Sequence, residues 1–82
     1  MTIDDIKTIL TDTLHLGAAG ANLQAESGLL GVLPELDSMA VVTIIGALEE
    51  QFGIVIDDDE ISAANFETVG TLAAFVDAKL AA

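Results

Sequence analysis

Ser38 is the residue of this sequence whose type and position best suit a covalent attachment. It follows Asp37 and begins a segment in which apolar residues recur every three or four positions, the spacing of an amphipathic helix. Asp37 is a good N-cap, because its carboxylate can accept from the free backbone N–H of Met39 or Ala40. Ser38 then occupies the first helical position with its hydroxyl directed outward. A phosphoryl ester there would lie beside the positive end of the helix dipole, so the position suits a serine-linked phosphate.

The residues near Ser38 in sequence do not supply a catalytic group. A serine nucleophile needs a neighbouring base, and no His or Lys stands beside Ser38. The single histidine, His15, falls near the end of another predicted helix, where it complements the helix dipole at the surface. The acidic run 57–60 lacks the alternating oxygen ligands and sixth-position glycine of an EF-hand, so it predicts a helix start and no metal site. We expect a protein that is not an enzyme.

Composition and charge restrict the partners and the compartment. The 82 residues carry a formal net charge of −12, with Lys7 and Lys79 as the only basic residues apart from the histidine, which argues against a nucleic-acid partner and favours basic ones. Cysteine is absent, so no disulfide framework exists. No stretch is apolar and long enough to span a membrane, and the N-terminus has no signal-peptide pattern. We expect a cytoplasmic monomer.

Hydrophobic periodicity predicts an all-α fold, a small four-helix bundle with a long loop between helices one and two. Three helices are principal and the third is short. The whole chain, residues 1–82, is predicted to be a single domain. Asp57 and Thr68 are the predicted N-caps of the third and fourth helices, and Thr2 with Asp5 forms a weak capping box for the first. The predicted helices span Thr2–Leu16, about Ser38–Gln51, Asp57–Asn65 and Thr68–Leu80.

The predicted loop, residues 17–36, is unusually long for so small a domain and needs side chains that pin it. Gly17 is the predicted left-handed stop of the first helix. A short helical turn is expected around 27–32, with Pro34 holding the chain extended before Asp37. The residues expected to pin the loop are Leu23, Leu29, Leu30, Leu33 and Leu36.

The helix beginning at Ser38 has two kinds of apolar residue. One set recurs at the spacing of a buried stripe and is predicted to form the centre of the core. Met39 and Val42 fall outside that stripe and flank Ser38, so they are candidates for an exposed docking surface, with Glu49 and Glu50 as further candidate partner contacts. The predicted buried stripe consists of Val41, Ile44, Ile45, Leu48 and Phe52.

The segment Leu36-Asp37-Ser38-Met39, then Val41-Val42 and Leu48-Glu49-Glu50-Gln51-Phe52-Gly53-Ile54, resembles the second helix of the acyl and peptidyl carrier proteins. The resemblance runs from about Ser27 to Leu80 and, more loosely, through the first helix. It implies that Ser38 carries phosphopantetheine derived from coenzyme A, and that an acyl, aminoacyl or peptidyl group is held as a thioester on the phosphopantetheine thiol. The implied partners are a phosphopantetheinyl transferase, a ligase or adenylating enzyme that loads the acyl or aminoacyl group, and an acyltransferase or synthase.

The sequence departs from the fatty-acid carriers at two positions of this helix. Those carriers have acidic residues early in the helix, whereas this chain has Ala40 and Thr43. The sequence is therefore at least as consistent with a specialised carrier, of aminoacyl or polyketide type, as with a fatty-acid carrier. The docking of partner enzymes on this helix is expected to be substantially apolar. Two other classes remain open: a noncovalent acidic interaction module with the same bundle, and a serine phosphoprotein without a prosthetic group.

Overall fold

The computed structural model describes residues 2–81 as three α-helices and two short 3₁₀ turns, with no β-strand in that range. The predicted domain of 1–82 includes two end residues that lie outside the described range. The all-α prediction is confirmed, although the predicted short third helix is a single 3₁₀ turn, and a second 3₁₀ turn occupies the predicted loop. In chain order the elements are α1 (Thr2–Leu14), η1 (Gly17–Asn22), α2 (Ser38–Phe52), η2 (Asp58–Glu60) and α3 (Val69–Ala81).

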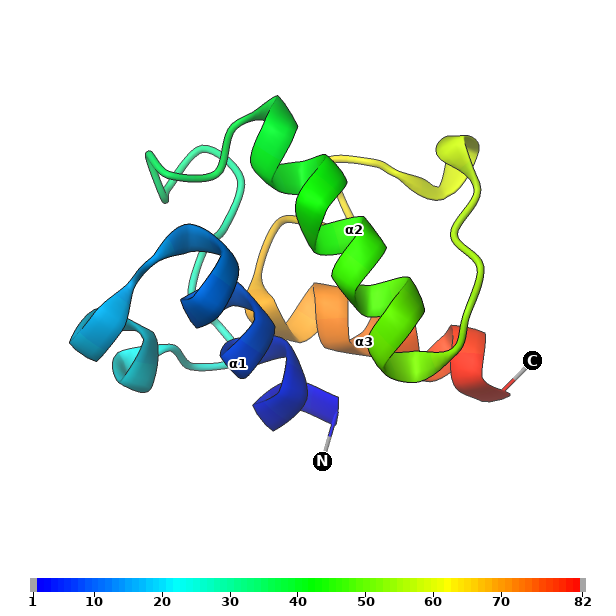
Figure 1. Ribbon diagram of the computed structural model, residues 1–82, viewed down its shortest axis with the longest axis horizontal. Helices are drawn as coiled ribbons and strands as arrows, with labels where there is room; N and C mark the ends of the chain where they lie inside the picture. The colour runs from blue at the N-terminus through cyan, green and yellow to red at the C-terminus, as the bar shows by residue number, and fades with distance from the viewer. Residues whose placement is uncertain (1, 82) are drawn as a thin grey trace.

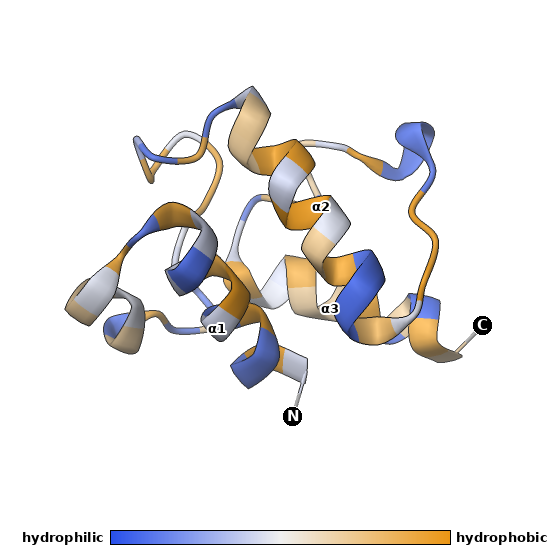
Figure 2. Cartoon of the chain, viewed as in Figure 1, coloured by the Kyte–Doolittle hydropathy of each residue, from blue (hydrophilic) through white to orange (hydrophobic). Residues whose placement is uncertain are grey.

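α1 is the common packing partner of the other two helices (Figure 1). Its Ile6 and Leu10 are fully buried, and they meet Ile44 and Leu48 of α2 and Leu72 of α3 in one apolar core. The sequence spacing explains this arrangement, because residues three or four apart share one face of a helix. Figure 2 shows the apolar residues of α2 and of the connector that follows it, and the hydrophilic turn η2.

α1 ends at Leu14, two residues before the predicted boundary. His15 adopts a left-handed conformation with φ 55°, and the Leu16 N–H donates to the Thr11 carbonyl at 3.0 Å, the long-range bond of a Schellman motif. Gly17 is also left-handed, with φ 57°, but it begins η1. The helix stop is therefore His15, and Gly17 serves a second turn.

The start of α1 also differs from the prediction. The Thr2 hydroxyl donates to the Asp77 carboxylate of α3 at 2.5 Å. Thr2 therefore joins the first and last helices rather than capping its own helix through a bond to its first turn.

The long loop is pinned largely through its backbone. An isolated antiparallel bridge joins Gly28 to Thr68, where a helical turn was predicted around 27–32; the turn present covers 29–33. Gly70 is required here, because a Cβ on it would lie 2.9 Å from the Ala25 carbonyl oxygen. Four backbone hydrogen bonds join the segments: Gly70 N–H to Ala25 O (2.7 Å), Val69 N–H to Ser27 O (3.0 Å), Leu29 N–H to Glu67 O (2.9 Å) and Leu30 N–H to Phe66 O (3.0 Å).

Most of the predicted apolar anchors of the loop are confirmed. Leu23, Leu29 and Leu36 are buried and Leu33 is half-buried. Leu30 is 43% exposed, so its inclusion among the anchors was wrong. Its backbone rather than its side chain holds that part of the loop.

α3 begins as predicted. The Thr68 hydroxyl accepts from the Thr71 N–H at 3.0 Å, and the Thr71 hydroxyl accepts from the Thr68 N–H at 2.9 Å, so the two threonines cap the helix reciprocally. Phe66 is buried ahead of this cap and anchors the entry to the helix. Val69, Leu72 and Val76 of α3 are fully buried, whereas Leu80 near its end is 47% exposed.

Candidate attachment site at the start of α2

Ser38 is exposed at the first position of α2. Asp37 precedes it in an extended conformation, with φ −101° and ψ −176°, and its Oδ1 accepts from the Ala40 N–H at 2.8 Å. The Asp37 carbonyl accepts from the Val41 N–H at 3.0 Å. The predicted cap is thus confirmed, with Ala40 rather than Met39 as the donor.

The chain reaches Ser38 through a tightly turned segment. The Leu36 N–H donates to the Leu33 carbonyl at 3.1 Å, and the Asp37 N–H donates to the Glu35 carbonyl at 3.1 Å. Leu36 is buried, so the serine lies two residues after a core anchor. The hydroxyl of Ser38 therefore projects from a backbone that is fixed on both sides.

The electrostatics at Ser38 favour an anionic group on the hydroxyl. The first N–H groups of an α-helix have no partner within the helix, and the dipole places partial positive charge at that end. The first turn of α2 contains no acidic side chain. Asp37, whose carboxylate is engaged by Ala40, brings the nearest negative charge in the sequence. A phosphodiester on Ser38 would fit this exposed position without displacing a core residue.

Two apolar side chains adjoin the serine on α2. Met39 is 73% exposed and Val42 is 64% exposed, whereas Ile44, Ile45 and Leu48 of the same helix are buried. The predicted division of the helix into a core stripe and an exposed apolar pair is therefore seen, although two members of the predicted stripe, Val41 and Phe52, are only half-buried. The upstream loop adds exposed Leu30 and Val32, which the sequence analysis did not identify as surface residues.

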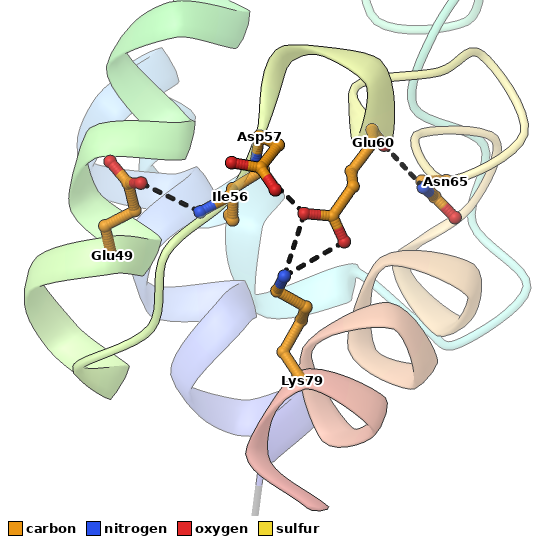
Figure 3. A network of polar contacts seen from close by, with 6 residues as sticks. All are labelled: Glu49, Ile56, Asp57, Glu60, Asn65 and Lys79. Atoms are coloured by element: carbon orange, nitrogen blue, oxygen red, sulfur yellow. Dashed lines mark hydrogen bonds and ion pairs between the residues drawn. The ribbon is translucent and has the colours of Figure 1, made fainter. Parts of the chain in front are cut away.

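The two glutamates predicted as partner contacts have different surroundings. Glu49 is half-buried, and its Oε2 accepts from the Ile56 N–H at 2.9 Å, so it holds the connector after α2 (Figure 3). Glu50 is exposed. No sequence spacing revealed the role of Glu49, because its partner is a backbone group in an extended segment.

A second polar cluster links η2 to α3. Lys79 Nζ lies 2.8 and 2.9 Å from the two carboxylate oxygens of Glu60, and Oε1 also accepts from the Asp57 N–H at 3.0 Å (Figure 3). The hydrogen bond from Lys79, followed by that from Asp57, holds the pKa of Glu60 below its ordinary value of 4.5. The sequence analysis did not predict this ion pair between Lys79 and η2.

The structure gives no separate metal centre in residues 2–81. No group of three His, Cys, Asp or Glu residues in this range could hold a metal ion. A hollow of about 390 Å³ lies between α1 and η1, and a second involves α1 and α2; neither is lined by Ser38. Among the described residues no helix is both long and apolar enough to cross a membrane.

The family model for phosphopantetheine attachment sites matches residues 4–76. The chain belongs to this family. As a phosphopantetheine-binding carrier, it presents a covalently held group to partner enzymes and is not itself an enzyme. Nearly all of α1 and the full length of α2 fall within the matched range, as does the beginning of α3.

Two relatives extend the comparison over almost the whole carrier. An acyl carrier protein of Helicobacter acinonychis (strain Sheeba) is 40% identical over 81 residues, which cover 95% of each chain. The solution NMR structure of a holo acyl carrier protein from Nitrosomonas europaea is 54% identical, with a TM-score of 0.93, and the match covers 100% of this chain and 99% of that one. Both fold and family are therefore shared, and the family's phosphopantetheine is the cofactor of this carrier.

Proposed function

We propose that Ser38 is the phosphopantetheine attachment residue and that the chain acts as a single acyl carrier domain. The observation that carries the proposal is an exposed serine hydroxyl at the N-terminus of α2, behind the Asp37 cap. Asp37 sets where the helix begins and so fixes the direction of the hydroxyl. When bound, the prosthetic group supplies a thiol on a long arm, on which an acyl, aminoacyl or peptidyl group is held as a thioester.

The role proposed for the protein is to fix one end of that arm. Tethering raises the effective concentration of the carried group for each enzyme that docks. The partners proposed are a phosphopantetheinyl transferase, a ligase or adenylating enzyme that loads the group, and an acyltransferase or synthase that receives it. A cytoplasmic monomer is proposed from the acidic, cysteine-free composition.

The surface proposed for these partners centres on Met39 and Val42. Their exposure beside Ser38 supports the proposal, because a partner that reaches the hydroxyl must approach the same end of α2. Glu50 is the proposed charged contact. Glu49 retains one unassigned carboxylate oxygen for a partner, but its other oxygen serves the Ile56 N–H.

The experiment is intact mass measurement after incubation with coenzyme A and a broad-specificity phosphopantetheinyl transferase. We expect the wild type and Ser62→Ala to gain the mass of one phosphopantetheine, and Ser38→Ala to gain none. Ser62 is a matched control because it is exposed and its hydroxyl serves only a weak 3.4 Å contact from the Asn65 N–H. Modification of Ser38→Ala, or a wild type that several such transferases leave unmodified, would overturn the assignment.

The same measurement separates the other function classes. A serine phosphoprotein would gain the smaller mass of a phosphoryl group when treated with a kinase and ATP, and nothing from coenzyme A. A noncovalent module would gain no mass in either reaction. The family match and the exposed helix-start serine favour the carrier over both.

A further inference from the structure

Met39 carries the one sulfur atom of the described residues 2–81. The sequence contains no cysteine, and the second methionine, Met1, lies outside the described range. Oxidants convert the thioether of methionine into a sulfoxide, which is polar and chiral where the thioether was apolar and flexible. Within residues 2–81 only Met39 offers a group for this reaction.

The fold leaves the Met39 side chain open to solvent at the apolar start of α2 (Figure 2). It is 73% exposed, the highest value among the large apolar side chains of the described range. By contrast, Ile44 and Leu48 of the same helix are fully buried. A small oxidant such as hydrogen peroxide therefore reaches the sulfur without any opening of the core.

The surroundings of Met39 accommodate an added oxygen atom. A sulfoxide oxygen carries partial negative charge, and at this end of α2 the helix dipole is positive and the first turn contains no acidic side chain. Thr43 lies one turn further along the same face, where its hydroxyl donates to the Met39 carbonyl at 3.0 Å. Because Met39 is outside the core, oxidation leaves the buried residues in place.

The same change alters the surface beside Ser38. Met39 and Val42 are both exposed and one turn apart, and they form the apolar surface proposed above for partner enzymes. Burying a sulfoxide in an apolar contact without a hydrogen-bond donor weakens that contact. The cap of the helix is unaffected, because the Ala40 N–H that binds Asp37 is a backbone group.

We propose that Met39 is an oxidation site and that its sulfoxide weakens the docking of partner enzymes at the start of α2. The Met39 sulfur takes one oxygen atom from hydrogen peroxide: the O–O bond breaks, an S–O bond forms, and the second oxygen leaves as water with both hydrogens. The sulfur is oxidised and the peroxide is reduced. A methionine sulfoxide reductase reverses the step with a pair of thiols, which become a disulfide as the oxygen leaves as water. The effect on docking rests on the attachment proposed at Ser38.

The first measurement is the rate at which hydrogen peroxide oxidises the full chain without its prosthetic group, in buffer and in urea. Intact mass counts the added oxygen atoms, and peptide mapping distinguishes Met39 from Met1. We expect Met39 of the folded protein to react within about twofold of its rate in urea, because its sulfur is already exposed. A rate in buffer about tenfold or more below the rate in urea would show that the fold protects the sulfur, and would overturn the proposal.

The second measurement is the kinetics of phosphopantetheine transfer to Ser38 by a broad-specificity transferase with coenzyme A, after catalase has removed the peroxide. We expect oxidation of Met39 to raise the KM of the transferase for the carrier about three- to tenfold, with kcat nearly unchanged and full modification after long incubation. Treatment with methionine sulfoxide reductase should restore the KM. The midpoint of thermal unfolding should not change, which separates weaker docking from a weaker fold.

Met39→Leu is the matched variant, because leucine keeps the surface apolar and has no sulfur. Peroxide still oxidises Met1 in this variant, but its KM, whatever the starting value, should be the same before and after treatment. An equal rise of the KM in Met39→Leu, or an unchanged KM for the oxidised wild type, would overturn the proposal. Failure of the transferase to modify the unoxidised wild type would instead contradict the attachment at Ser38, so the two proposals fail separately.

Discussion

The carboxylate of Glu49 accepts a hydrogen bond at 2.9 Å from the backbone N–H of Ile56, a residue seven positions further along the chain. Glu49, a helix residue, thereby satisfies a backbone donor in the extended segment that follows the helix. The side chain of Ile56 in that segment is buried. Glu49 differs in this from Glu50, the next residue, which faces solvent. Two adjacent glutamates therefore have separable roles.

Replacing Glu49 with Ala should destabilise the fold, because the Ile56 N–H loses its acceptor. Leaving such a donor unsatisfied costs about 1–3 kcal/mol. Glu49→Gln should recover most of that loss, since its amide oxygen still accepts, and Glu50→Ala should change the free energy of unfolding by no more than about 0.5 kcal/mol. Urea unfolding followed by circular dichroism measures all three. Equal losses for Glu49→Ala and Glu50→Ala would show that the bond is unimportant for stability.

Replacing Asp37 with Ala should weaken the start of α2, because the Ala40 N–H loses its cap. The expected loss is about 1 kcal/mol, or about 4–8 °C in melting temperature for a domain of this size. Asp37→Asn should retain most of the stability, since asparagine caps equally well. Thermal unfolding compares the two; a loss as large in Asp37→Asn would mean that charge rather than capping is decisive.

The end of α1 offers a pair of opposite substitutions. His15 has φ 55° without being glycine, so His15→Gly should stabilise the protein by about 1 kcal/mol. Gly17 has φ 57° with open space around its missing Cβ, so Gly17→Ala should destabilise it by about 1–2 kcal/mol through the backbone alone. The denaturant midpoints of the two variants, compared with that of the wild type, show whether each substitution stabilises or destabilises the protein. If His15→Gly is destabilising, the imidazole contributes a contact that outweighs the strain.

The three long helices and the helix-start serine were predictable because they depend on local features. Apolar spacing placed Ile44, Ile45 and Leu48 in the core, and Asp37 and Thr68 are caps readable from single residues. The boundary of α1 was missed because glycine is the common left-handed residue, whereas His15 adopts that conformation here.

The contacts missed by the sequence analysis join residues that are distant in sequence. Lys79 and Glu60 are 19 residues apart, and no periodicity relates them. The loop is fixed by backbone bonds to residues 66–70, which carry no side-chain signature. The 3₁₀ turn at Gly17–Asn22 arose in a stretch of small residues with weak local preference. Tertiary packing decided these features.

The Glu60–Lys79 ion pair should make stability depend on acid pH. The pKa of Glu60 is lowered in the folded state, so its contribution is present above the ordinary value of 4.5 and is lost as the pH falls through the folded pKa. Lys79→Met should therefore be less stable than the wild type at pH 7, and the difference should shrink below about pH 4.5. Urea unfolding of both proteins between pH 7 and 3 measures it. A difference that stays constant to pH 3 would show that Lys79 contributes through packing rather than charge.

The last prediction concerns the partner surface beside Ser38. Met39→Asp and Val42→Asp should each slow loading of the carried group about tenfold or more, because a carboxylate would be buried in an apolar contact. Stability should change little, since both side chains are exposed in the free protein. Glu50→Gln is the charge control and should slow loading less; Glu49 is avoided because it supports Ile56.

The measurement is the loading rate of phosphopantetheinylated protein by the loading enzyme, with intact mass confirming equal modification of Ser38 beforehand. Checking the modification first separates an effect on docking of the loading enzyme from an effect on attachment of phosphopantetheine. If Glu50→Gln is the most impaired variant, the loading enzyme recognises the carrier electrostatically. That result would favour a carrier of the fatty-acid type, which partners recognise through its acidic residues, over a specialised carrier. If Met39→Asp and Val42→Asp are the most impaired, the neutral Ala40 and Thr43 mark an apolar docking helix.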